Sequence, residues 1–411
     1  MRPAREILKM KQMPYPAADS DAFKYATSDA SRAVVIAQAR RHWIDGEGLS
    51  HDLPASAARI APWITRSWQR CIEAGQRPQH QVAFDAVSQT AATRVAERHH
   101  ALVSAARPVI DRLSRAIADT RYFAILTGTD GIVIDVGALP GGTDAADRHA
   151  RDIARIGVDL SERAVGTSAI GAALAEQESV WLHRGEHFFD ATSVYSCAGA
   201  PLFGPEGDCI GMLDLTGVQV AERPELQHLA AQSARSIENA LVQRHACELL
   251  LHLAWPGSAE SESSDGLLCI DAEGRVTGAN AAARQMLHQP LLRQLAALHC
   301  NDLFALPLDM LFDAARRGDT VEVPLWSGLR MRVRPRNGGP ESERTKAMDS
   351  EATTADVVPP RLRDVETALI RKAVTDARGN VAEAARALGI SRATVYRKLW
   401  RGKISGRGAR D

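Results

Sequence analysis

The hydrophobic pattern changes at Tyr122, and this change limits the fold more than any other feature of the sequence. Before it, apolar residues such as Ile60, Ile64 and Trp68 recur at helical spacing. After it, short apolar runs are separated by turn signals such as residues 129–131. The pattern predicts strands over residues 122–127, 132–136, 179–183, 194–203 and 209–216, followed by a helix over residues 224–253. Strands bracketed by helices favour an antiparallel α+β domain.

Two polar stretches divide the rest of the chain. Residues 254–265 and 335–360 are rich in Gly, Pro, Ser or charged side chains, so we expect both to be linkers. Between them, residues 266–278 predict a hairpin and residues 281–287 a helix. The chain has 411 residues, of which 45% are apolar and 24% charged. This length and balance predict about two to four folded domains and exclude a mainly disordered chain.

The cysteines and the hydropathy bear on the compartment. Six cysteines are scattered without a Cys-x-x-Cys pair, so neither a zinc ribbon nor a disulfide scaffold is expected. No stretch approaches the roughly 20 apolar residues of a membrane span. Residues 1–16 lack the apolar core of a signal peptide. We therefore expect a cytoplasmic protein that does not contact a membrane.

The segment 379–399 has the spacing of a helix-turn-helix. Small Ala385 permits two short helices to cross closely, Gly389 suits the tight turn, and Ser391 is a good N-cap for the second helix. The apolar positions expected to fill the small core are Val381, Leu388, Ile390, Val395 and Leu399. Residues 357–411 carry thirteen Arg and Lys against five Asp and Glu, although the whole chain is neutral. Basic charge is thus concentrated where the last helices are expected.

Five residues of this segment are expected to face double-stranded DNA. Ser391 begins the second helix, Arg392 is the candidate for reading a base edge, and Thr394 for a base or phosphate contact. Arg397 and Lys398 are expected to contact phosphates. The alternative is an ordinary helical hairpin whose basic face is only solvated. The coincidence of the small residue, the glycine, the N-cap, the apolar spacing and the local charge favours DNA binding.

A broad apolar stripe precedes the helix-turn-helix segment. It consists of Leu362, Val365, Leu369 and Ala373, with Ile370 and Val374 alongside. Together with residues 391–394, this stripe resembles the Fis-type helix-turn-helix, and the resemblance covers residues 361–400. In Fis-type domains the equivalent helices pair, so the resemblance implies a homodimer.

Four ordered blocks of sequence mark the first half of the chain. They are residues 164–171, 185–188, 196–201 and 211–217. These blocks resemble the GAF sensor of acetoin-catabolism-type transcriptional activators, and residues 64–71 resemble that family's helical lead-in. Ser168 stands where the family usually carries Asn. The resemblance implies a domain that binds a small-molecule effector.

Two further segments bear on the comparison with that family. Residues 274–287, with Asn280 after the predicted hairpin, resemble the start of a PAS domain, or serve as a spacer or dimerisation element. Whole family members carry an ATPase domain between sensor and DNA-binding domain, which needs a Gly-x-x-x-x-Gly-Lys-Ser/Thr loop. Here Ala172 occupies the Lys position after Gly171, and Gly402-Lys403 is followed by Ile404. We therefore expect a regulator that lacks the central ATPase domain.

These observations predict a multidomain α+β protein. Its parts are a helical lead-in (1–90), a GAF-like antiparallel sheet with flanking helices (91–253), a linker (254–265), a PAS-like segment (266–334), a flexible linker (335–360) and an all-α Fis-type helix-turn-helix (361–411).

The predicted sensor contains candidate ligand-binding residues but no catalytic constellation. The residues expected to border a cavity are Trp181, His187, Phe188, Cys197 and Asp214. The alternative is that Trp181 and Phe188 fill the core. His183 and His187 have the i, i+4 spacing of a metal pair, but Gly185 lies between them and His183 ends a predicted strand, so no metal is expected. No cofactor is expected either.

The sequence thus predicts a regulator that binds DNA, senses a small metabolite and is not an enzyme, with RNA polymerase as a further partner. Two alternatives remain open. One is a redox enzyme that uses Cys197 of the GAF-like half. The other is an architectural protein that binds DNA without a signal.

Overall fold

The computed structural model describes residues 29–44, 60–84, 87–257, 266–287 and 298–338, together with residues 370, 373–374, 377, 380–388, 390, 392 and 395. The chain divides into two compact units, of which one spans Asp29–Glu366 and the other includes the C-terminal residues from Thr367. Within the described ranges, every helix is too short or too polar to cross a membrane.

The first unit contains an antiparallel sheet of five strands in the order β2-β1-β5-β4-β3. The strands are β1 (Tyr122–Thr127), β2 (Val133–Val136), β3 (Val180–His183), β4 (Tyr195–Phe203) and β5 (Cys209–Val218). Gly131, with φ of +78°, lies in the turn between β1 and β2, where a left-handed residue is needed. The five strands and the antiparallel α+β class expected from the sequence are confirmed.

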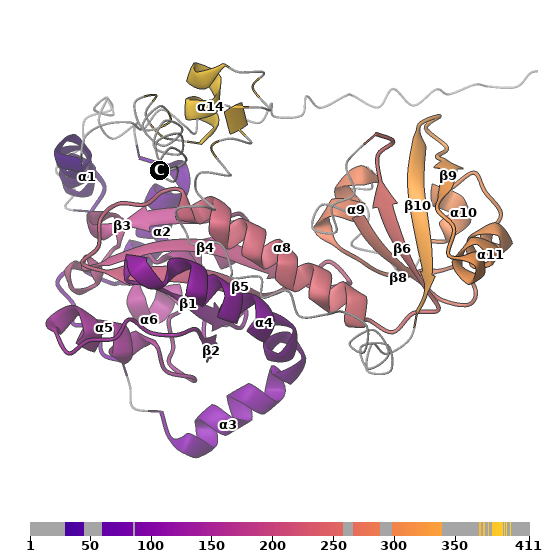
Figure 1. Cartoon of the computed structure of the whole chain (residues 1–411). Helices are drawn as coiled ribbons and strands as arrows, with labels where there is room; N and C mark the ends of the chain where they lie inside the picture. The colour runs from indigo at the N-terminus through magenta and orange to yellow at the C-terminus, as the bar shows by residue number, and fades with distance from the viewer. Residues whose placement is uncertain are drawn as a thin grey trace, which may run out of the picture. The chain divides into compact units, whose positions relative to one another are not determined.

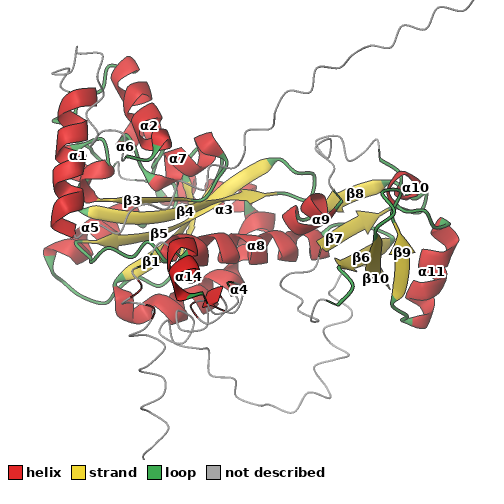
Figure 2. Cartoon of the chain, turned by 90° about the horizontal axis from the view of Figure 1, so that it is seen from above, coloured by secondary structure: helices red, strands yellow, loops and turns green. Residues whose placement is uncertain are grey.

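Helices cover both faces of this sheet (Figures 1 and 2). They are α1 (Asp29–Trp43), α2 (Pro62–Glu73), α3 (Gln89–Arg98), α4 (His100–Ile117), α5 (Ala145–Ile153), α6 (Glu162–Val165), α7 (Ala169–Glu176) and α8 (Leu226–Arg244), with short 3-10 helices η2 (Ala118–Thr120), η3 (Arg184–Glu186) and η4 (Asp190–Thr192). Helices α4 and α8 pack on one face, while α5, α6 and α7 pack on the other. The sheet thus separates two hydrophobic cores.

The alternation of side chains along β5 assigns the two faces different chemistry. Leu213 and Leu215 point into the core beneath α4 and α8. Met212 points into the opposite core, and the buried polar residues Asp214 and Thr216 share its side of the strand. The buried polar side chains of β5 therefore lie on the α7 side of the sheet.

A second antiparallel sheet follows, with the strand order β8-β7-β6-β10-β9. Its strands are β6 (Leu249–Ala254), β7 (Gly266–Ile270), β8 (Val276–Ala279), β9 (Val321–Pro324) and β10 (Arg330–Asn337), and its helices are α9 (Ala281–Met286), α10 (Cys300–Leu303) and α11 (Leu308–Arg317). One face packs with these helices around a core that includes Phe304 and Leu311. The predicted hairpin and helix after residue 266 are confirmed.

Two boundaries differ from the sequence prediction. The helix expected over residues 224–253 is wrong at its C-terminal end, because α8 ends at Arg244 and β6 follows. Leu249, Leu251 and Leu253 of β6 are fully buried in the second core, where the strand lies between β7 and β10. Residues 335–337, expected to begin a linker, instead belong to β10, which ends at Asn337.

The C-terminal unit contains α14 (Val381–Ala387) within the predicted helix-turn-helix. The Asn380 side chain caps this helix by accepting hydrogen bonds from the backbone N–H groups of Ala382 and Glu383. Ala385 and Val395 are buried, with Val381, Leu388 and Ile390 packed around them. This agrees with the small core expected from the spacing, of which Leu399 lies outside the described residues.

Candidate functional site

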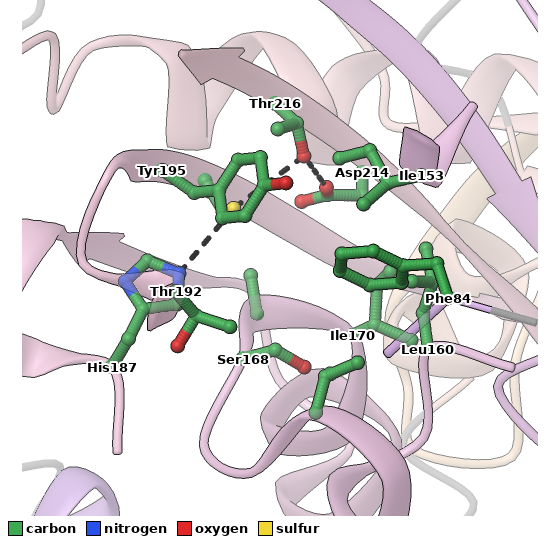
Figure 3. Close-up of a pocket in the computed structure, with 13 residues that line it drawn as sticks. Phe84, Ile153, Leu160, Ser168, Ile170, His187, Thr192, Tyr195, Asp214 and Thr216 are labelled. Carbon is green, nitrogen blue, oxygen red and sulfur yellow. Dashed lines mark hydrogen bonds between the residues drawn. The ribbon is translucent and has the colours of Figure 1, made fainter. Parts of the chain in front are cut away.

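A small cavity lies between the α7 side of the first sheet and the segment that carries α7 (Figure 3). Its lining consists of Phe84, Ile153, Leu160, Val165, Ser168, Ala169, Ile170, His187, Thr192, Tyr195, Cys197, Asp214 and Thr216. The cavity has a volume of about 40 Å³. A cavity that holds a single water molecule has about 10–15 Å³ of such space, so this cavity fits a molecule of only a few non-hydrogen atoms.

The register of β4 and β5 brings the polar residues of the cavity together. Cys197 pairs with Thr216, and Gly199 pairs with Asp214. A Cβ atom on Gly199 would lie 3.0 Å from the carbonyl oxygen of Ala169 at the start of α7. The glycine therefore allows the N-terminus of α7 to approach the sheet beside Asp214.

Asp214 is the buried acid of the cavity. Its Oδ2 accepts a hydrogen bond from the Thr216 hydroxyl, while Oδ1 is buried without a partner among the residues that the structure describes. Burial raises the pKa of this carboxyl to about 7. Below that pH the group is neutral, and a proton on Oδ1 would make it a hydrogen-bond donor to a bound molecule.

His187 adds a neutral imidazole on the opposite side of Cys197. Its Nδ1 lies 2.9 Å from the Arg184 carbonyl oxygen, so we assign the proton to Nδ1. Its Nε2 lies 3.7 Å from the Cys197 sulfur. Burial lowers the pKa of His187 to about 4 and raises the pKa of the Cys197 thiol well above its usual value. Both groups are therefore uncharged at neutral pH.

The loop that carries His187 is held by α1. The Arg40 guanidinium donates to the backbone carbonyls of Gly185, His187 and Phe188 at 3.1, 2.6 and 3.0 Å. About two turns earlier on α1, Arg32 forms an ion pair of 2.5 Å with Glu186, whose side chain is only 3% exposed. A lead-in helix far away in sequence thus fixes the backbone of a cavity residue.

The structure brings three of the five predicted ligand residues together. His187, Cys197 and Asp214 line the cavity, whereas Trp181 and Phe188 do not. Trp181 pairs with Ala198, which points into the core beneath α4 and α8, so the indole lies on the opposite side of the sheet from Cys197. Phe188 is fully buried in a separate core with residues of α1 and α2, as the alternative interpretation anticipated.

Several lining residues were missed from the sequence. Thr216 follows Asp214 by two positions on one strand, so strand alternation alone places both side chains on one face. Tyr195 precedes Cys197 by two positions and follows the same rule. Phe84 carries no such signal, because it reaches the cavity from a segment without a helix or strand.

The structure describes only part of the predicted DNA-binding segment. Arg392 is exposed, in agreement with a side chain available to a partner. Ser391, Thr394, Arg397 and Lys398 lie outside the described residues. Across the described ranges, no group of three or more His, Cys, Asp or Glu residues is placed to hold a metal ion.

The chain therefore joins an α+β domain that contains a buried polar cavity to a C-terminal segment with helix-turn-helix spacing, a combination that occurs in bacterial transcriptional regulators. Residues 36–239 match the family model of the MimR N-terminal domain, and residues 361–401 match that of the bacterial regulatory proteins of the Fis family. The chain thus combines a MimR-type N-terminal domain with a Fis-type helix-turn-helix, and relatives that it matches are named as transcriptional regulators.

Curated relatives agree with this family. The chain is 31% identical over 236 residues to the acetoin catabolism regulatory protein of Cupriavidus necator, covering 56% of this chain and 35% of the relative. It is 28% identical over 212 residues to the acetoin dehydrogenase operon transcriptional activator AcoR of Bacillus subtilis, covering 52% and 34%. The chain therefore spans about a third of the length of these relatives.

A solved structure is similar over a larger share of the chain. It is the E. coli DhaR(N)-DhaL complex, in which the similar chain is 14% identical, with a TM-score of 0.41, over 66% of this chain and 98% of that chain.

Proposed function

We propose that the chain is a DNA-binding transcriptional regulator that senses a small, uncharged, oxygen-containing molecule in the cavity beneath α7. The observation that carries the proposal is the buried Asp214 carboxyl, whose Oδ1 faces the cavity without a partner among the described residues. A protonated Oδ1 would donate to a hydroxyl or carbonyl oxygen, and the apolar walls would disfavour a charged molecule.

The cavity volume and the relatives support the same class of effector. About 40 Å³ suits a molecule of a few non-hydrogen atoms. The relatives' names refer to acetoin, a small neutral hydroxyketone. We therefore propose short alcohols, diols, ketones and hydroxyketones as candidate effectors.

Helix α1 is the element that we propose transmits ligand binding from the cavity to the rest of the chain. A molecule that contacts His187 would shift the loop whose carbonyls bind Arg40. We propose that the loop has two positions, each of which favours a different position of α1. A ligand that binds one loop position more tightly would shift the equilibrium toward that position.

The DNA-binding residues and the assembly remain as the sequence predicts. Arg392 would read a base edge, Thr394 a base or phosphate, and Arg397 and Lys398 phosphates, in a homodimer whose two helices span successive major grooves. We propose that the regulator acts on RNA polymerase without an ATPase of its own, because the chain lacks the phosphate-binding loop.

The redox alternative receives less support. Burial raises the pKa of Cys197 and so disfavours the thiolate that redox chemistry requires. Turnover with a thiol reductant, abolished by Cys197→Ser, would favour this alternative.

A thermal-melting screen of the whole chain tests effector binding. A molecule present at 100 times its dissociation constant stabilises its site by about 2.7 kcal/mol. We expect at least one short oxygenated compound to raise the melting temperature, and Asp214→Ala to abolish the shift. If no alcohol, diol, ketone or hydroxyketone shifts the melting temperature, the domain is a scaffold and the proposal fails.

A further inference from the structure

Strand β10 of the second sheet carries arginines at every second position. Met331, Val333 and Pro335 are buried, and the first two belong to the core that packs against the helices. Because side chains alternate along a strand, the intervening residues lie on the opposite side of the sheet. These residues, Arg330, Arg332, Arg334 and Arg336, are called the arginine face.

The neighbouring elements leave the arginine face accessible. Helix α8 covers the same side of the sheet farther along, where Val242 packs against Leu267 and Cys269 of β7. The side chains of β10 are less covered: Arg330 and Arg336 are exposed, and the two arginines between them are half-buried. The strand lies next to the edge strand β9 (Figure 1).

Two of these arginines pair with no acidic side chain in the described part of the chain. Arg330 lies 3.5 Å from Glu322 of β9. The side chains of Arg334 and Arg336 form no ion pair or hydrogen bond with any described residue. His252 on β6 is buried beside them, and burial, followed by the charges of these two arginines, lowers its pKa to about 4.

The arginines of α11 differ in this respect. Arg316 pairs with Asp313 at 2.9 Å, and Arg317 pairs with Asp319 at 2.8 Å. The first 356 residues of the chain carry more acidic than basic side chains, since the neutral chain concentrates its excess basic charge after residue 356. Arg334 and Arg336 are therefore basic side chains without a described acid to pair with, and they lie in residues 1–356, which together carry a net acidic charge.

We propose that the arginine face binds the phosphate backbone of duplex DNA, as a second DNA contact in addition to the helix-turn-helix. Guanidinium groups bind phosphate oxygens with paired hydrogen bonds. Alternate residues of a strand repeat about every 6.6 Å, so the four arginines span roughly 20 Å. One DNA strand offers a phosphate for about every 3.4 Å of helix axis, so several lie within this span.

The proposed contact is independent of DNA sequence, because phosphates carry no base information. It rests on the DNA binding assigned to this chain under the proposed function. The operator is therefore not needed for the test, and a random-sequence duplex serves as the probe.

The test compares two double variants of the full chain by fluorescence anisotropy over a range of salt concentrations. One variant is Arg334→Gln with Arg336→Gln, and the matched control is Arg316→Gln with Arg317→Gln, which removes the same charge. Each phosphate contact contributes about 0.9 to the slope of log affinity against log salt. We expect the first variant to lower the magnitude of the slope by about 2 and the control to leave it unchanged.

Melting curves of both variants show whether they are folded, and a single Arg336→Gln variant, at an exposed position, should lower the slope by about 1. Equal slopes for wild type, test variant and control would overturn the arginine face as a DNA contact. If the test variant instead changes the sedimentation of the free protein and leaves the slope unchanged, the face binds a second copy of the chain, and the proposal is wrong. A wild-type chain that binds no duplex at low salt would overturn the proposed function as well.

Discussion

The pH dependence of stability at Asp214 is a direct consequence of the cavity. The pKa of this carboxyl rises from an ordinary value of 3.8 to about 7 in the folded chain, because burial disfavours the charged form. Between these two values the folded state holds a proton that the unfolded state has released. Stability from this group is therefore present at low pH and is lost as the pH rises through the window from about 4 to about 7.

The magnitude follows from the size of the shift. One pKa unit corresponds to about 1.4 kcal/mol, so a shift of about three units makes a total difference of about 4 kcal/mol. About 3 kcal/mol of this stability is lost between pH 5 and pH 8. Asp214→Asn keeps the shape and still offers an oxygen to the Thr216 hydroxyl, but it does not titrate.

Urea unfolding of the wild type and of Asp214→Asn at both pH values measures the effect. We expect the stability of the wild type relative to the variant to fall by about 3 kcal/mol from about pH 5 to about pH 8. Glu238 has a pKa that burial raises to about 7, and it titrates in both proteins, so its contribution cancels. A difference between the two proteins that does not change with pH would refute a buried, protonated Asp214.

Three further predictions concern other parts of the chain. Arg32→Ala should lower the free energy of unfolding, measured in urea, by about 3–5 kcal/mol, because it leaves Glu186 buried without its cation. Arg66→Ala, in a more exposed ion pair, should lower it by less than about 1 kcal/mol. Equal losses would show that burial of the pair is unimportant. Gly199→Val should lower the free energy of unfolding by about 1–3 kcal/mol and with it the melting temperature, since its side chain would meet the Ala169 carbonyl. An unchanged melting curve would contradict the close approach of α7. Arg392→Ala should weaken binding to a specific DNA site by about 1–3 kcal/mol in a mobility-shift assay, and full affinity would remove this residue from the interface.

The fold of the first sheet could be predicted because its strands are locally marked. The run Tyr122–Thr127 and its partner Val133–Val136 are separated by a glycine turn, and the long strands β4 and β5 are joined by a Gly-Pro-rich hairpin. Strand β6 could not be separated from α8 in the same way. Its run of leucines, interrupted by His252, fits a buried strand or a buried helix, and only β7 and β10, distant in sequence, decide between them.

The site shows the same division between local and distant information. Cys197 and Asp214 reach the cavity because they lie on adjacent strands and on one face. The pairing of Trp181 with Ala198 would have excluded Trp181 from the cavity, but the register of β3 against β4 depends on contacts that spacing does not reveal. The clamp of Arg40 on the loop of His187 joins residues about 150 positions apart.

The measurement that tests the central claim most directly is the DNA affinity of the full chain with and without an effector found by melting. If the chain is a sensor-regulator, the effector should change the affinity of the wild type by roughly 5-fold to 150-fold, the usual range for coupled sites. In Asp214→Ala the same compound should change it little. Equal affinities of the wild type with and without the bound effector would contradict the account and indicate a DNA-binding protein that receives no signal from this cavity.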